Sequence, residues 1–351
     1  MMSDSDVLLE MRDLKVHFFT DEGVVKAVDG VTYKIRRGKT MCVVGESGSG
    51  KSVAARAILQ IVHRPGKIVG GKILYHKPLA NGSTQTIDIT ALNPRGADIR
   101  RIRGNDIAMI FQEPMTSLSP LYTVGNQIIE AIRLHNQVSK REARNRAIEL
   151  LRRVGIPKPE VRVDEYPFRL SGGMRQRCMI AMALSCNPKL LIADEPTTAL
   201  DVTTQAQILD LMQELQQDYG MAILFITHDL GVVAEIADDV AVMYLGNVVE
   251  SSDADTIFNN PKHPYTMSLL KSIPKIGLER TRLDPIRGMV PSPFERPAGC
   301  TYHPRCDFAV QGVCNQVQPS SISVGEYHEA TCLMYDEQYK EAFLEKEASH
   351  G

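Results

Sequence analysis

The stretch GESGSGKS, which runs from Gly45 to Ser52, decides how the rest of this chain is interpreted. It matches the pattern G-x-x-x-x-G-K-[ST] at every fixed position. The apolar run from Thr40 to Val44 precedes it, and apolar residues at helical spacing (Val53, Ala54, Ala57, Ile58 and Ile61) follow it. A glycine-rich turn between a strand and a helix lets backbone N–H groups surround phosphate oxygens. We therefore expect a phosphate-binding loop formed by Gly45, Ser47, Gly48, Ser49, Gly50, Lys51 and Ser52.

The chemistry of this loop predicts roles for its last two residues. The Lys51 ammonium group would contact the β and γ phosphates, and the Ser52 hydroxyl would bind Mg²⁺. Further along the chain, LLIADE is an apolar run that ends in Asp194 and Glu195. We expect Asp194 to hold Mg²⁺ through water. Glu195 would be the general base that activates the attacking water, a role typically worth about 10²–10⁴ in rate.

A third glycine-containing motif, LSGGM, stands directly before a helical pattern. Ser171 is placed as the helix cap, and the N–H groups of Gly172 and Gly173 are the first free donors of that helix. These donors form a second anion site. Because the first loop already surrounds its nucleotide from the other side, we expect this site to bind a phosphate presented by another subunit.

Composition excludes several classes of protein. The 351 residues are 43 % apolar, which is enough for about two domains of ordinary size. Lys plus Arg number 40 and Asp plus Glu number 42, so the charge balance gives no electrostatic reason to expect nucleic acid or anionic lipid as a partner. The longest apolar run has seven residues, far fewer than the about twenty of a spanning helix, and the N-terminal sequence does not resemble a signal peptide. We expect a soluble, intracellular chain.

The order of patterns along the chain predicts a doubly wound α/β core. Short apolar runs alternate with helical patterns from Val7 to about residue 131, and Asn81-Gly82 favours a tight hairpin turn. Residues 113–185 are predicted to be a mainly helical insertion, in which Ser139 and Glu142 have the spacing of a capping box. The apolar runs 190–193, 222–226 and 240–245 then predict strands buried on both faces of a largely parallel sheet. A Pro-rich segment and clustered cysteines follow. We therefore expect one domain over residues 1–255 and a C-terminal extension over residues 256–351.

The C-terminal cysteines have the spacing C-x5-C-x7-C-x17-C. Four thiolates can hold zinc or a [4Fe–4S] cluster, and this spacing lacks the paired C-x2-C motifs that are common at structural zinc sites. Unligated buried thiols are the third alternative, and His303 or His328 could replace a thiolate at a zinc site. The residues concerned are Cys300, Cys306, Cys314 and Cys332.

The motifs together resemble those of ATP-binding subunits of ABC transporters. GESGSGKS, IFQEP, LSGGM, LLIADEP, ALD and ITHD occur here in the order typical of that family. The resemblance implies a RecA-like P-loop core of the ABC type with an antiparallel β subdomain, a helical insertion and here a small Cys-rich C-terminal extension. It also implies that two such subunits enclose two ATP molecules head to tail.

The same resemblance implies roles for individual residues. Gln112 is similar to the residue that touches Mg²⁺ or water and relays closure to membrane subunits. Asp201 resembles the aspartate that reaches across the dimer, and His228 resembles the histidine that contacts the γ-phosphate. Phe18 is similar to the aromatic residue that stacks on adenine, with Phe19 as the alternative.

Longer segments narrow the resemblance to one group of importers. FQEPMTSLSP, NPKHPYTMSLL and GCTYHPRC are similar to ATP-binding subunits of dipeptide and oligopeptide importers. This implies an ATPase that energises peptide import from the cytoplasmic face of the cell membrane. The implied partners are a related ATPase subunit or a second copy, two permeases and an external solute-binding protein. The implied cofactors are ATP, Mg²⁺ and a [4Fe–4S] cluster.

The sequence leaves three alternatives to peptide import. Related importers carry nickel or glutathione. Soluble ABC-type ATPases act on DNA or ribosomes, but this chain has a single nucleotide cassette and no basic stripe. An iron–sulfur protein in which the nucleotide only signals is the third alternative. Because most of the chain carries hydrolysis motifs, peptide import is the function that we expect.

Overall fold

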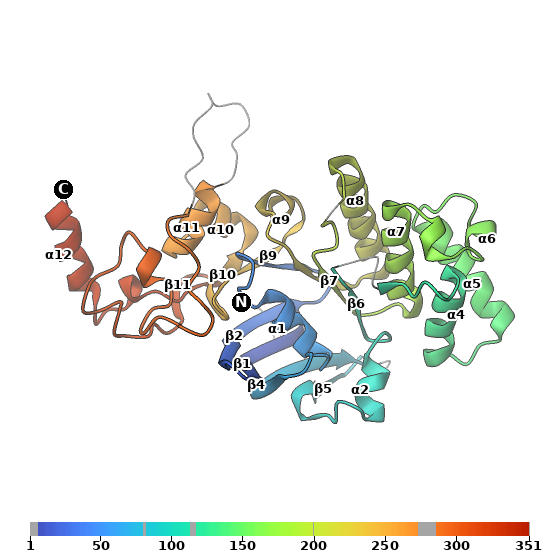
Figure 1. Ribbon diagram of the computed structural model, residues 1–351, viewed down its shortest axis with the longest axis horizontal. Coiled ribbons are helices and arrows are strands. Elements are labelled where there is room, and N and C mark those ends of the chain that lie inside the picture. The colour runs from blue at the N-terminus through green and yellow to red at the C-terminus, as the bar shows by residue number, and fades with distance from the viewer. Residues whose placement is uncertain (1–5, 80–81, 113–116, 199, 273–285, 351) are drawn as a thin grey trace. The chain divides into compact units, whose positions relative to one another are not determined.

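The computed structural model describes residues 6–79, 82–112, 117–198, 200–272 and 286–350 (Figure 1). The chain forms two compact units, each assembled from separate stretches of sequence. The first unit consists of Met1–Leu8, Ile35–Thr40 and Ala91–Ile226, and the second of Leu9–Lys34, Met41–Thr90 and Thr227–Gly351. This division differs from the expected one, and the boundary near residue 255 stays a prediction.

Parallel strands form the centre of the first unit. They lie in the order β6 (Ile107–Ile110), β7 (Leu190–Asp194) and β8 (Ala222–Ile226). Every residue of β7 and β8 is buried. Strands covered on both faces need apolar side chains at every position, which is why continuous apolar runs predicted them correctly. The strand β7 brings Asp194 to its carboxyl end.

Helices fill the described part of the predicted insertion. They lie together in Figure 1, and α5 packs against α4 and α7. Two serines start helices as expected: Ser139 accepts a hydrogen bond from the Glu142 N–H at 3.1 Å, and Ser171 accepts one from the Met174 N–H at 3.3 Å. The helices of the unit are α2 (Ala97–Ile102), α4 (Val124–His135), α5 (Lys140–Arg153), α6 (Pro159–Arg162), α7 (Gly172–Ala183) and α8 (Val202–Tyr219).

The second unit contains an antiparallel sheet, which agrees with the expected β subdomain. Its strands lie in the order β2-β1-β4-β5. Leu9 pairs with Tyr75 and Phe18 with Gly66, so β1 and β4 run in opposite directions. Asn81 of the predicted hairpin turn lies outside the described residues, although β4 and β5 are paired antiparallel. The bounds are β1 (Val7–Thr20), β2 (Gly23–Arg36), β4 (Gly66–Pro78) and β5 (Thr84–Asp88).

A second group of strands in this unit carries the phosphate loop. The strand β3 (Thr40–Val44) lies parallel to β9 (Asp239–Tyr244), and the antiparallel order continues through β10 (Asn247–Asp253), β12 (His328–Ala330) and β11 (Ile322–Gly325). Helix α1 (Lys51–Ile58) follows the loop directly. It is shorter than the apolar pattern predicted, because Ile61 lies beyond its end.

The C-terminal part of the second unit has its own small core. Cys314, Leu333 and Phe343 are buried there together. Each helix that the structure describes is too short or too polar to cross a bilayer. The remaining helices of this unit are α9 (Leu230–Ile236), α10 (Ala254–Asn259), α11 (Pro264–Lys271) and α12 (Lys340–His350). Two 3₁₀ turns are η5 (His303–Arg305) and η6 (Leu333–Tyr335).

Candidate active site

The phosphate loop has the close backbone approaches that its glycines predict. Gly45 has φ 147°, and a Cβ there would lie 2.1 Å from the Met243 carbonyl oxygen. Gly50 has φ 98°, and a Cβ there would lie 2.2 Å from the Ala27 carbonyl oxygen. A side chain at either position would therefore displace the loop. The N-terminus of α1 also has no side-chain cap, which suits the binding of an anion.

Lys51 lies across the phosphate loop. Its Nζ donates to the Gly45 carbonyl at 2.7 Å, the Glu46 carbonyl at 3.0 Å and the Ser49 hydroxyl at 3.3 Å. The side chain is buried, so the ammonium group is held in one place by the loop that it serves. The contact of Lys51 with phosphate oxygens stays a prediction. Ser47 and Gly48 lie at the exposed tip, and Ser52 lies in the first turn of α1.

The predicted carboxylates lie at the carboxyl end of β7 in the first unit. Asp194 is fully buried, and Glu195 follows with φ 47°, in the left-handed region that side chains seldom occupy. The Glu195 Oε2 accepts a hydrogen bond from Gln112 Nε2 at 2.9 Å and another from the Thr198 hydroxyl at 2.9 Å. The structure thus brings Gln112 and Glu195 together, and it adds Thr198, which the sequence patterns did not single out.

The LSGGM motif forms the expected helix start. Ser171 caps α7 with extended backbone, and Ser171 and Gly172 are exposed. A Cβ on Gly172 would have no atom within 4 Å, whereas one on Gly173 would lie 3.0 Å from the Thr204 methyl carbon. The helix start is therefore open to solvent at Ser171 and Gly172. This is the arrangement that binding of a phosphate from outside requires.

Asp201 and His228 are both exposed residues beside helix starts. Asp201 caps α8 and accepts hydrogen bonds from the Thr204 N–H at 2.9 Å and the Thr204 hydroxyl at 2.8 Å. These bonds, led by that of the backbone N–H, lower the pKa of Asp201. His228 follows Thr227, and the next residue, Asp229, caps α9. The roles of Asp201 at a dimer interface and of His228 at the γ-phosphate stay predictions.

The two adjacent aromatic residues differ in exposure. Phe18 is half-buried against Gly66, where a Cβ would lie 2.8 Å from the Phe18 ring. Phe19 is 45 % exposed, and the Lys67 ammonium group lies 5.6 Å from its ring centroid. The assignment of Phe18 to adenine stacking therefore stays a prediction, and Phe19 is the more accessible ring.

The expected Mg²⁺ donors are a hydroxyl, an amide and a carboxylate, from Ser52, Gln112 and Asp194. The first belongs to the second unit, and the other two belong to the first unit. Within the described ranges no three His, Cys, Asp or Glu side chains gather closely enough to hold a metal ion. A magnesium ion bound to ATP needs no such group, because phosphate oxygens and water complete its ligands.

The C-terminal cysteines line one small cavity. Pro264, Leu333 and Phe343 contribute apolar surface to it. Burial raises the pKa of the Cys300 thiol, and it raises the pKa values of Cys306 and Cys332 to about 12. The cysteines that line the cavity are Cys300, Cys306, Cys314 and Cys332.

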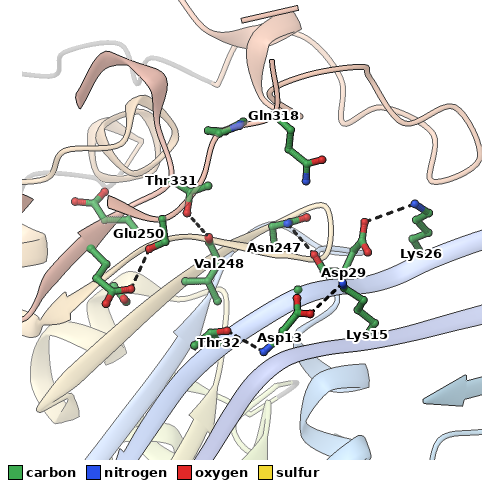
Figure 2. A pocket seen from close by; sticks show the side chains of 15 residues that line it. Asp13, Lys15, Lys26, Asp29, Thr32, Asn247, Val248, Glu250, Gln318 and Thr331 are labelled. Carbon is green, nitrogen blue, oxygen red and sulfur yellow. Dashed lines mark hydrogen bonds and ion pairs between the residues drawn. The ribbon is translucent and has the colours of Figure 1, made fainter. Parts of the chain in front are cut away.

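A larger cavity in the second unit is polar, and no residue of the phosphate loop lines it. Figure 2 shows Lys15 beside Asp13 and Lys26 beside Asp29, and the ion pairs measure 3.0 and 3.8 Å. Across the cavity, the Thr331 hydroxyl donates to the Val248 carbonyl at 3.0 Å. The cavity has a volume of about 460 Å³. Both lysines that line the cavity are paired with aspartates. The cavity is therefore a polar contact region between β1, β2 and the C-terminal region.

Comparison with known proteins matches two families. Residues 28–198 match the family described as ABC transporter, and residues 249–314 match the oligopeptide/dipeptide transporter C-terminal region. The oligopeptide transport ATP-binding protein AppD of Bacillus subtilis is 50 % identical, over 94 % of this chain and 98 % of its own. The dipeptide transport ATP-binding protein DppD of Escherichia coli is 47 % identical, over 93 % of this chain and 96 % of its own.

Solved structures agree with this relationship. The dimeric bacterial ABC transporter cassette MJ0796 superposes with a TM-score of 0.59 at 26 % identity and covers 70 % of this chain and 99 % of its own. A post-hydrolysis form of the same cassette, bound to ADP and phosphate, has a TM-score of 0.58. The phosphate loop, the carboxylates after β7 and the capped LSGGM helix thus belong to an ATP-hydrolysing cassette, and the chain is a member of the ABC transporter family, among its oligopeptide/dipeptide transporter ATP-binding subunits.

Proposed function

We propose that this chain hydrolyses ATP at the cytoplasmic face of a membrane and thereby drives peptide import through separate permease subunits. The contact between Gln112 and Glu195 carries the proposal. It joins the general base for hydrolysis to the glutamine that is expected to sense the membrane subunits. The peptide substrate is supported by the match over residues 249–314 and by the names of the relatives from B. subtilis and E. coli.

In the proposed reaction, the two units contribute residues with different roles. Lys51 and the loop N–H groups hold the phosphates, and His228 contacts the γ-phosphate. Ser52, Gln112 and Asp194 would hold Mg²⁺, and the ion would supply positive charge that stabilises the transferred phosphate. Glu195 accepts the proton of the attacking water. The hydrogen bonds from Gln112 and Thr198 fix the Glu195 carboxylate before the substrate arrives, so that little reorganisation is needed.

A second ATP-binding subunit completes each site in this proposal. The exposed start of α7 offers the Ser171 hydroxyl and the N–H groups of Gly172 and Gly173 to a γ-phosphate held by the partner. Asp201 would lie at the same interface. The dimeric form of the MJ0796 cassette supports this arrangement. We expect a related subunit as the partner, or a second copy of this chain, with an external binding protein delivering peptides to the permeases.

We further propose that the C-terminal cysteines hold a [4Fe–4S] cluster. The support is that four thiols line one cavity of the second unit. A tetrahedral zinc ion bound by the same thiols is the alternative. A [4Fe–4S] cluster would be bound by one thiolate from each of the four cysteines. Its role would be structural.

Substitution of the proposed base tests hydrolysis and transport together. The complete transporter, reconstituted in vesicles with its binding protein, should take up labelled dipeptide only with internal ATP. Glu195→Gln should still bind ATP but hydrolyse it about 10²-fold or more slowly, because the general base is lost. Glu214→Gln, an exposed position on α8, is the matched control.

Two results would contradict the proposal. Near-normal hydrolysis by the Glu195→Gln transporter would remove Glu195 from the role of base. Uptake of nickel or glutathione by the same vesicles, without uptake of dipeptide, would show that the transporter does not serve dipeptide import.

A further inference from the structure

The second residue of the phosphate loop, Glu46, has a buried partner 259 positions away in sequence. Arg305 donates from Nη1 to Glu46 Oε2 at 2.7 Å and from Nη2 to Glu46 Oε1 at 3.1 Å. The Arg305 side chain is 3 % exposed and that of Glu46 is 27 % exposed. Two parallel bonds between a guanidinium and a carboxylate fix direction as well as distance. The loop is therefore anchored to the C-terminal region by a bidentate pair.

The surroundings of Arg305 hold it in this position. Its Nε donates to the Arg287 carbonyl at 2.8 Å. The guanidinium carbon lies 5.8 Å from the ring centroid of Tyr244 and 6.0 Å from that of Tyr302, within cation–π range. A long side chain that is fixed at its stem and between two rings has few other conformations available. Arg305 can therefore hold Glu46 at little further cost in entropy.

A second bond from the C-terminal region reaches the backbone of the same loop residue. The Glu46 N–H donates to the Tyr265 hydroxyl at 2.9 Å. The Tyr265 ring packs on Tyr244 at 4.7 Å and on Tyr302 at 5.3 Å between centroids. The same aromatic cluster thus supports both the arginine and the tyrosine that contact Glu46.

The backbone of Glu46 continues the connection to the phosphate-binding lysine. Its carbonyl oxygen accepts the hydrogen bond from Lys51 Nζ at 3.0 Å. Glu46 is therefore held by its side chain, its N–H and its carbonyl, and the last of these is shared with the ammonium group that serves the phosphates. A shift of Glu46 would move the loop and the lysine. An unpaired Glu46 carboxylate would also place a negative charge close to the triphosphate.

We propose that Arg305 is a positioning residue for ATP binding, which holds Glu46 so that the phosphate loop keeps the form that accepts the triphosphate and cancels the charge of the Glu46 carboxylate. The C-terminal region then sets the ATP affinity of the cassette. The inference rests on ATP binding at the loop, as proposed above.

The test measures binding of a fluorescent N-methylanthraniloyl derivative of ATP to the full-length chain with its co-purified subunits. Arg305→Gln should raise the Kd about tenfold, the scale of coupling between residues that share one hydrogen-bonded salt bridge. The KM for ATP should rise in parallel, and kcat at saturating ATP should change less than about twofold, because the base is untouched. Arg287→Gln, an exposed arginine in the same region, is the matched control.

The double variant separates positioning from simple loss of stability. If Arg305 acts through Glu46, Arg305→Gln should have little effect on the Kd in a Glu46→Gln background. If Arg305→Gln does not fold, Arg305→Lys is the variant to measure. It keeps the positive charge but loses the bidentate geometry, so the Kd should rise, but less than tenfold.

The outcomes distinguish this inference from the proposed function. An unchanged Kd in folded Arg305→Gln, or an equal rise in the presence and absence of the Glu46 carboxylate, would overturn the inference alone. Failure of the unaltered chain to bind the ATP derivative would overturn the proposed function itself.

Discussion

Gly50 shows how a single residue limits the phosphate loop. It has φ 98°, and a Cβ there would lie 2.2 Å from the Ala27 carbonyl oxygen, so two separate penalties would meet at this position. Gly38 provides a comparison, because it has φ 64° and no atom lies within 4 Å of the place that a Cβ would occupy. An alanine at Gly38 would meet only the strain of a left-handed backbone, whereas an alanine at Gly50 would also collide with the Ala27 backbone.

We predict that Gly50→Ala abolishes detectable ATP binding, whereas Gly38→Ala leaves it intact. Gly38→Ala should cost about 1–2 kcal/mol in the free energy of unfolding, the usual penalty of a left-handed alanine. Gly50→Ala should cost more and should displace the loop from its phosphate-binding form. Denaturant unfolding and calorimetric titration with ATP would measure both effects. Equal behaviour of the two variants would show that the contact with Ala27 does not limit the loop.

At the scale of elements, short turns rather than long helices arrange the cysteines. The Cys300 N–H donates to the Cys314 carbonyl at 2.8 Å, and η5 lies between Cys300 and Cys306. Cys332 directly precedes η6. A bound group that links four thiolates would join these turns, which are distant in sequence, and would add to the stability of the small core around Cys314 and Leu333.

We predict that the full-length chain, purified without oxygen, carries about four irons and absorbs broadly in the violet. Cys332→Ser should lose most of the iron, because it removes one ligand. Cys186→Ser should keep it, since Cys186 is the half-buried thiol of the first unit and does not line the cavity. Iron analysis and absorption spectra would check both variants. Stoichiometric zinc without iron would contradict the cluster.

The elements also show what the sequence could and could not predict. β7 and β8 were predictable because burial on both faces demands an uninterrupted apolar run. The caps Ser139 and Ser171 were predictable because a cap is a local interaction. The proximity of Gln112 to Glu195 was implied only by the family resemblance, since no local pattern links residues 83 positions apart.

The pair of Glu46 and Arg305 could not have been predicted from any local pattern. Glu46 stands at a variable position of the loop motif, and Arg305 lies among the C-terminal cysteines. Only the folded second unit brings their charges together. The end of α1 at Ile58 was also missed, because helical spacing continues to Ile61 in the sequence while the helix does not.

At the scale of the whole molecule, the proposed dimer depends on an exposed helix start. Ser171 and Ser139 are a matched pair within the first unit: they cap α7 and α5 with φ values of −66° and −65° and similar hydrogen bonds. Only Ser171 is expected to face a nucleotide on the partner subunit. The same substitution at the two serines therefore separates loss of a cap from loss of an interface.

We predict that Ser171→Arg prevents ATP-dependent closure in the assembled transporter, because its bulk occupies the place of the γ-phosphate. Each change to arginine should lower the free energy of unfolding by about 1 kcal/mol, because the helix loses its N-terminal cap. Ser139→Arg should keep ATP hydrolysis within about twofold, since a substitution away from the site leaves transition-state contacts in place. ATP turnover and thermal unfolding would check both. Turnover by Ser171→Arg equal to that of Ser139→Arg would contradict the composite site.

The discontinuous second unit has a consequence for synthesis on the ribosome. Its phosphate loop is translated early, but the residues that anchor Glu46, and the strand β12 that pairs with β10, come from the C-terminal stretch. Until that stretch has emerged, β10 can pair only with β9, and its other edge stays unpaired. Domains generally fold as units during translation, so this unit should reach its native form only near the completion of the polypeptide.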